Sequence, residues 1–276
     1  MSVANAASPP RIEVRRLDYR FDPDMSVDFA GNPLLSALFG ALSVAFGPGE
    51  RLFIESVRHY LPEVDDKALR RDVYAFIGQE ANHTDAHHAF NARLEDLGYP
   101  AAHLEESVRR RIERVSAAAK PEVRLAWTVA LEHFTAIIAS GLLTHPDVLE
   151  RMHPDVARLW AWHAVEEIEH RSVAFDVYQR VVGDEALRRR TMRLVTVMFL
   201  SQVSYRTVVM MRQAGTHRDV RGITRGLGQL FGRRGLLSRI LPRYLDFYRA
   251  GFHPEAHDES GLIAQALERY VGDFVS

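Results

Sequence analysis

Cysteine is absent from the 276-residue chain. This absence excludes a disulfide framework, a zinc site with thiolate ligands and catalysis by a thiol nucleophile. The chain also lacks the basic start and the apolar run of a secretory signal peptide, because residues 1–11 are polar and include Pro9 and Pro10. The sequence therefore predicts a cytoplasmic protein.

Long hydrophobic runs are scarce as well. Residues 194–205 are apolar, but Arg193 and Arg206 bracket only twelve positions. A helix that spans a bilayer needs about 20 apolar residues. We therefore expect no transmembrane segment, and we interpret residues 194–205 as a helix that faces the core.

The formal net charge of −1 conceals an uneven distribution of charge. Residues 188–249 contain fourteen arginines and only two acidic residues, Asp219 and Asp246, so the rest of the chain is acidic. A basic block of this kind is typical of segments that contact anionic surfaces. The sequence therefore indicates an anionic lipid or an acidic partner for the basic C-terminal segment.

Helical periodicity, interrupted by proline and glycine, predicts an all-α protein. We expect a disordered tail at residues 1–11, an irregular cover segment at 12–33, a four-helix bundle at 34–183 and a basic helical extension at 184–276 packed on the bundle. The expected core helices are 34–60, 66–97, 121–143 and 154–182, with an interruption near Pro48, a crossover helix at 103–119 and a long helix at 185–214.

Glutamate and histidine recur in an order that ordinary helical packing does not require. The chain contains two Glu-x-x-His pairs, each preceded by a single glutamate. Residues three apart lie on one face of a helix, so each pair can present a carboxylate and an imidazole to the same point. A further histidine four residues before the second pair shares its face. The resulting set is Glu50, Glu80, His83, Glu132, His163, Glu167 and His170.

The four glutamates of this set lie at similar distances, measured along their helices, from the predicted turns. Glu50 and Glu80 are 11 and 14 residues from the turn at 61–66, and Glu132 and Glu167 are each 12 residues from the turn at 144–155. At about 1.5 Å per residue, all four carboxylates are roughly 17–21 Å from their turns. If the two hairpins pack together, these carboxylates share one layer of the bundle, as in a dimetal carboxylate protein.

The charge of this set favours two divalent cations. Four buried carboxylates would be prohibitively costly without compensation, and two divalent cations neutralise them. Mixed oxygen and nitrogen donors suit iron or manganese best, with zinc as a further alternative, and we expect iron. We therefore predict two metal ions held by the seven residues. His87 and Glu166 are predicted to contact the ligands rather than the metals.

Four motifs resemble a bacterial family described as metal-dependent hydrolases. They are the segments Phe46–Glu50, Gln79–His83, Trp162–His170 and Tyr248–Pro254, and the resemblance extends from about residue 12 to residue 258. Ala250 stands where the family pattern has proline, which affects no ligand.

The same site is similar to that of ferritin-like di-iron proteins. Its His-x-x-x-Glu-x-x-His ending, from His163 to His170, is similar to that of di-iron arylamine N-oxygenases. The resemblance implies a ferritin-like four-helix bundle with a long crossover and additional C-terminal helices, and it carries over all seven residues as metal ligands.

The leading functional hypothesis is an oxidase or oxygenase with a carboxylate-bridged dinuclear centre, expected to be di-iron. Such an enzyme would activate dioxygen to oxidise a small, largely apolar substrate, and an electron-donor protein is a candidate partner. Small residues beside Glu132 and apolar residues near Glu50 favour an enclosed pocket for that substrate. The alternative is a metal-dependent hydrolase that uses a metal-bound hydroxide. A ferroxidase or metal-storage protein is a third hypothesis, and the oligomeric state stays open.

Overall fold

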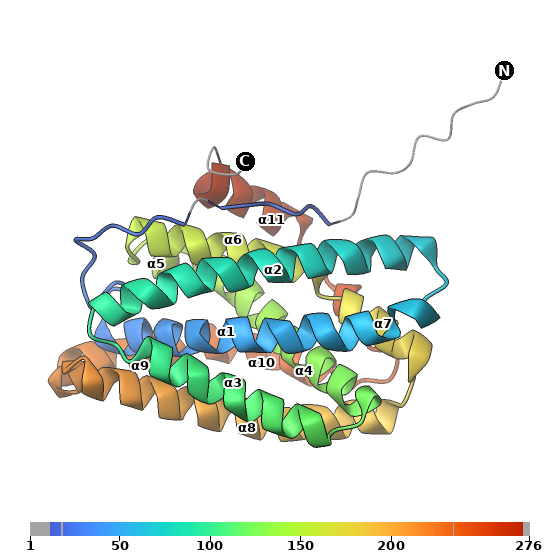
Figure 1. Cartoon of the computed structure of the whole chain (residues 1–276). Coiled ribbons are helices and arrows are strands. Elements are labelled where there is room, and N and C mark those ends of the chain that lie inside the picture. Colours follow the sequence, from blue (N-terminus) through green and yellow to red (C-terminus); the bar gives the residue numbers. More distant parts are fainter. Residues whose placement is uncertain (1–11, 18, 234, 273–276) are drawn as a thin grey trace.

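Two helical hairpins form the bundle that holds the candidate site (Figure 1). The computed structural model describes residues 12–17, 19–233 and 235–272. No β-strand occurs among these residues, so the chain is all-α, as predicted. The first hairpin is α1 (Pro33–Tyr60) with α2 (Lys67–Asp96), the second is α4 (Pro121–Leu143) with α6 (Pro154–His170), and α3 (Ala101–Ala118) connects them.

The remaining elements extend and cover this bundle. In Figure 1, α1 lies between α2 on one side and α3 and α8 on the other. The further helices are α5 (Pro146–Leu149), α7 (Val173–Val181), α8 (Glu185–Gln213), α9 (Val220–Phe231), α10 (Leu236–Asp246) and α11 (Ser260–Ala266). Short 3-10 turns are η1 (Leu61–Glu63), η2 (Thr216–Arg218) and η3 (Pro254–Ala256), and η4 (Leu267–Val271) is a π-helical turn.

Side-chain caps fix where the long helices begin. Asn32 accepts a hydrogen bond from the backbone N–H of Leu35 at 3.0 Å, and Pro33 follows as the first residue of α1. Asp66 and Asp184 cap α2 and α8 in the same way, each accepting two backbone N–H groups. Such caps satisfy donors that a helix start would otherwise leave unpaired.

Two helix boundaries differ from the prediction. α1 continues through Pro48, where the sequence predicts an interruption, because a proline removes only one backbone hydrogen bond and the packed helix tolerates the loss. The predicted helix at 154–182 is instead two helices, α6 and α7, separated at Arg171 and Ser172. At this break Arg171 donates a hydrogen bond to the carbonyl oxygen of His257 at 2.6 Å, which ties the C-terminal segment to the bundle.

The hydrophobic core consists of two clusters with a polar layer between them. Along α1, Val44 belongs to the first cluster and Leu52 to the second, and the buried Glu50 lies between them. Along α2, Phe76 and Ala86 belong to different clusters, and residues 80–83 lie between them. The apolar clusters therefore fold the bundle, and the layer between them carries polar side chains.

The segment before α1 is not helical and covers the groove between α2 and α6. Its backbone carbonyls at Glu13 and Arg15 accept hydrogen bonds from Gln79 (2.8 Å) and Asn82 (3.0 Å). The Arg15 guanidinium donates two hydrogen bonds to the Glu169 carboxylate, at 2.7 and 2.8 Å. This segment thereby closes the polar layer from outside. Residues 1–11, predicted to be disordered, lie outside the described residues.

The interpretation of residues 194–205 as a core-facing helix is wrong for most of this stretch. These residues belong to α8, which packs on α1 and α4 through one narrow face that includes Val195 and Val203. The opposite face is open to solvent, and Val197 and Tyr205 are 68% and 61% exposed. Apolar residues occur on every side of α8 in this stretch, so its sequence pattern did not reveal which side would be buried.

Three helices are long and apolar enough to cross a membrane by length and composition. The first is α1 together with η1, and 67% of its apolar stretch is buried inside the bundle. The second is α4, with 83% of its apolar stretch buried, and the third is α8, with 33%. The apolar character of α1 and α4 is explained by their place in the core. For α8 the expectation that the chain has no transmembrane segment stays a prediction.

Candidate metal centre

The structure brings all seven predicted side chains into the polar layer. α1 and α4 each provide one glutamate, α2 provides a Glu-x-x-His pair, and α6 provides the His-x-x-x-Glu-x-x-His set. Each of the seven side chains belongs to a residue that is at most 3% exposed. Ligand atoms lie within 4.8 Å of one another in three groups: Glu50 with His83 and His163; Glu80 with Glu132 and His170; and Glu80 with His83 and Glu167.

Glu167 lies between the histidines of this layer. Its Oε1 is 3.0 Å from Nε2 of His163 and 3.6 Å from Nδ1 of His83. Its Oε2 is 3.7 Å from Nε2 of His170, which in turn is 3.3 Å from Oε1 of Glu80. The two oxygens of the Glu167 carboxylate therefore face two different groups of potential ligands.

The layer contains many buried polar atoms without a hydrogen-bond partner. Every one of the seven residues has at least one such atom, although buried polar groups in proteins are almost always paired. The unpaired atoms are Oε1 of Glu50, both oxygens of Glu80 and of Glu132, Nδ1 of His83, Nε2 of His163, Oε2 of Glu167 and Nε2 of His170. Unpaired carboxylate oxygens and imidazole nitrogens around one point are the donor set that a transition-metal pair requires.

Each of the three imidazoles is oriented by a partner on its other nitrogen. Nε2 of His83 lies 3.1 Å from Oε2 of Glu166, and Nδ1 of His163 lies 2.8 Å from Nε2 of His87. The remaining nitrogen of each ring faces the layer without a partner. Glu166 and His87, predicted to contact the ligands, thus occupy positions from which they set the orientation of two rings.

The third imidazole has a partner that the sequence analysis missed. Nδ1 of His170 lies 2.9 Å from the side-chain oxygen of Gln79, and the amide nitrogen of Gln79 donates to Glu169 at 3.0 Å. Thr84 was also missed, and its hydroxyl donates to Oε2 of Glu50 at 2.8 Å. Gln79 and Thr84 directly flank the first Glu-x-x-His pair, but neither residue type carries a spacing rule that would identify it from sequence.

Burial dominates the ionisation of the layer. It raises the pKa of Glu50, Glu80 and Glu132 well above the usual carboxyl range, with neighbouring carboxylates adding to the effect for each. Burial also lowers the pKa of His83 well below its usual value. For Glu167, burial acts to raise the pKa, but His170 and His163 lower it well below the usual range. Without cations Glu50, Glu80 and Glu132 thus resist ionisation, whereas Glu167 favours the ionised form, and neutral imidazole is the form that binds metals.

We expect Gln79→Met to weaken metal binding by about 10- to 100-fold, because His170 would lose the acceptor that fixes its ring. The measurement is a metal titration against a competing chelator. Asn82→Leu is the matched control, since Asn82 anchors the same covering segment from the same helix without touching His170. Equal losses in the two variants would mean that the covering segment, and not the orientation of His170, determines the affinity.

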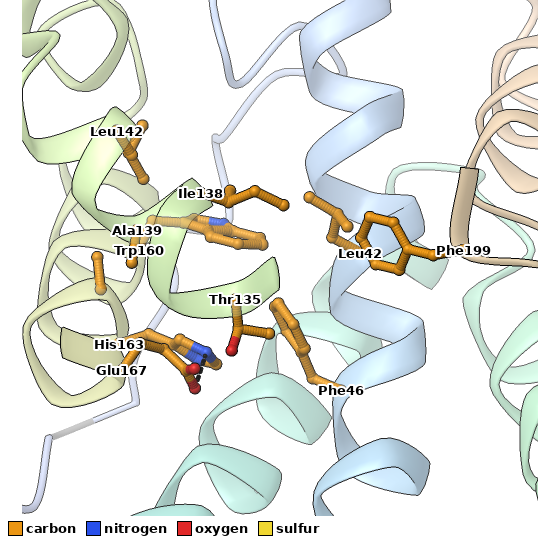
Figure 2. Close-up of a pocket in the computed structure, with 11 residues that line it drawn as sticks. Leu42, Phe46, Thr135, Ile138, Ala139, Leu142, Trp160, His163, Glu167 and Phe199 are labelled. Atoms are coloured by element: carbon orange, nitrogen blue, oxygen red, sulfur yellow. Dashed lines mark ion pairs between the residues drawn. The ribbon is translucent and has the colours of Figure 1, made fainter. Parts of the chain in front are cut away.

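Two cavities adjoin the layer. The smaller, of about 20 Å³, is lined by His163, Glu167 and Thr135 among others, and it has room for a single water-sized molecule (Figure 2). The larger, of about 360 Å³, is lined by Glu50 and by side chains of α1, α3, α4 and α8. Leu42, Phe46, Thr135 and Phe199 line both cavities. A mostly apolar cavity is therefore present beside Glu50, and Thr135 is one of the small residues that border it. Glu132 does not line this cavity, and the cavity is not enclosed as predicted, because it reaches the exposed Arg111.

The comparison with protein families gives a match over most of the chain. Residues 13–258 match the family described as predicted metal-dependent hydrolases, in agreement with the resemblance seen in the four motifs. Comparison with curated proteins and with solved structures gives no match. The family match covers the whole polar layer and all seven predicted ligands, and it shows that the chain belongs to the family of predicted metal-dependent hydrolases.

Proposed function

We propose that the protein is an enzyme with two metal ions held in the polar layer by the seven predicted ligands. The observation that carries this proposal is the set of unpaired, buried carboxylate and imidazole atoms that converge there. Two divalent cations would neutralise the four glutamates and remove the cost of burying them. The geometry favours one ion held by Glu50, His83 and His163, and a second held by Glu80, Glu132 and His170. Glu167 faces both groups and is the proposed bridge.

Hydrolysis is the reaction class that the family membership supports. Bound metal ions would supply a Lewis acid and activate a water molecule. The chain itself would contribute the small cavity beside His163 and Glu167, which can hold one water next to the ligands. The partners of the imidazoles would keep the ligand nitrogens aimed at the metals.

Oxidation with dioxygen is the second candidate, and the composition of the site favours it. Four carboxylates and three imidazoles suit iron, and the larger cavity has mostly apolar walls that include Phe46 and Phe53. Such walls exclude water and suit an apolar substrate. The ferritin-like arrangement and the likeness to arylamine N-oxygenases remain predictions, as do the electron-donor partner and the cytoplasmic location. Metal storage stays a weaker alternative, because a storage protein has no need of an apolar cavity.

Metal analysis followed by two activity assays separates these reactions. We expect two metal ions per chain by elemental analysis of the metal-replete protein, and one ion or none would contradict the dinuclear proposal. Cleavage of apolar esters or amides without oxygen uptake would establish hydrolysis. Oxygen uptake and new absorption bands after air is added to the reduced iron-loaded protein would establish oxidation. Oxidation of ferrous ions that proceeds identically with and without organic compounds would indicate storage.

A further inference from the structure

Two arginines that line the larger cavity have no role in the proposed function. Arg206 of α8 and Arg111 of α3 line the cavity together with the apolar side chains of α1, α4 and α8. Arg206 is only 8% exposed, whereas Arg111 is exposed. Arg111 therefore marks the solvent side of the cavity, and Arg206 is a buried cation in its wall.

Neither guanidinium has an anionic partner in the described part of the chain. Arg206 forms no hydrogen bond or ion pair there, and the charged group that acts on it most strongly is Arg111, which repels it. Burial, followed by this repulsion, lowers the pKa of Arg206 to about 10, so the side chain is still charged at neutral pH. A buried, unpaired charge is costly, and nine-tenths of Arg206 is withdrawn from solvent. This cost is relieved when an anion binds.

The lining of the cavity carries charged groups of both signs. Glu50 is the only acidic residue among those that line it, and it belongs to the proposed metal centre. The rest of the lining is mostly apolar and includes Trp127, Leu131 and Met198. Phe199 lines both cavities, and Arg206 lies seven residues further along α8, about 10 Å at the rise of a helix. A ligand that contacts both Arg206 and the wall near Phe199 must therefore be extended.

We propose that the cavity binds an anionic amphiphile, with a carboxylate or phosphate head at Arg206 and Arg111 and an apolar chain directed toward Glu50. Its volume of about 360 Å³ lies within the range of small-molecule sites. Arginine pairs recognise planar carboxylates and phosphates through several charge-assisted hydrogen bonds. Gln202, one turn before Arg206, also lines the cavity and can donate to the same head group. This inference names the substrate class of the proposed enzyme, and it places the reacting carbon away from the anionic head.

Calorimetric titration of the metal-loaded protein tests the proposal with four probes below their micelle concentrations. They are dodecanoate, dodecyl phosphate, dodecan-1-ol and butanoate. We expect at least one of the two long-chain anions to bind about tenfold or more tightly than dodecan-1-ol, and butanoate to bind too weakly to saturate. The comparison of dodecanoate with dodecyl phosphate shows whether the head is a carboxylate or a phosphate. Equal affinity for the long-chain anions and the alcohol, or no binding at all, would overturn the proposal.

Arg206→Met separates the arginine site from binding at the metals. This change removes a buried unpaired charge and keeps an apolar side chain of good helix propensity, so the fold should be retained. We expect the preference for the anion to disappear while the affinity for dodecan-1-ol stays the same. Arg212→Met, on the exposed part of the same helix, is the matched control and should bind all probes like the unaltered protein. An anion preference that persists in Arg206→Met would mean that the head group binds the metals, and the proposal would be wrong.

Failure of this inference is distinguishable from failure of the proposed function. Binding is measured without turnover, and the metal content of each sample is determined separately. A protein that holds two metals but shows no anion preference retains the dinuclear proposal and loses the amphiphile site. A protein that shows the preference without two metals retains the amphiphile site and loses the dinuclear proposal.

Discussion

Glu132→Ala and Glu167→Ala should each lose most of the bound metal, together with any metal-dependent activity, while the helical content is retained. Glu132 has two buried oxygens without hydrogen bonds, and Glu167 faces three histidines. Removing either carboxylate deletes a ligand and leaves two divalent cations with incomplete charge compensation. The apolar clusters that fold the bundle do not include these side chains. Elemental analysis and circular dichroism measure the two outcomes.

Two further variants make this result specific. Glu132→Gln keeps the shape of the side chain and removes its charge, so it should also bind less metal if charge compensation is the cause. Glu55→Ala removes an exposed glutamate from α1 and should bind metal normally. If Glu132→Ala or Glu167→Ala still holds two metal ions, that glutamate is not a ligand.

Trp162→Ala should destabilise the protein by about 3–5 kcal/mol, because a large buried aromatic side chain leaves a cavity that the surroundings cannot fill. Trp162 is fully buried in the first apolar cluster. Its ring stands nearly perpendicular to that of His83, with ring centroids 4.9 Å apart, and it also packs near Tyr19. The loss would therefore loosen His83 as well, and we expect weaker metal binding in addition to a lower urea midpoint.

The matched control is Trp127→Ala. Trp127 is only partly buried and already borders the larger cavity, so its removal enlarges an existing space instead of creating a new one. Urea unfolding of the two variants should show a clearly smaller loss of unfolding free energy for Trp127→Ala. Similar losses of unfolding free energy in the two variants would mean that Trp162 is packed no more tightly than Trp127.

The site could be predicted because its signal is local. Each Glu-x-x-His pair lies within one helical turn, so helix geometry alone places its two side chains on one face. The single glutamates Glu50 and Glu132 followed from their order in the chain and from similar distances to the turns, and the structure brings them to the same layer. Gln79 could not be predicted, because its role depends on a contact with His170, 91 residues away.

The helix boundaries show the same difference between features that neighbouring residues determine and features that distant contacts determine. Caps and prolines defined the ends of α1, α2 and α4 to within about two residues, as expected for boundary assignments. The break between α6 and α7 at Arg171 was not predicted, because Arg171 pairs with His257 and Glu259 of the C-terminal segment. The buried side of α8 was not predicted either, since its apolar residues occur on every side of the helix and carry no periodic signal.

The sequence by itself determined which side chains are candidate metal ligands and which helices carry them, because these properties depend on residue type and on spacing within a turn. Only the tertiary structure decided which nitrogen of each histidine is free, through partners such as Glu166 and His87 on other helices. It also decided that Arg206, one of fourteen arginines in a basic block, lines the same cavity as Glu50. A charge run looks the same in sequence whether its members face solvent or a cavity, and only helix packing distinguishes the two.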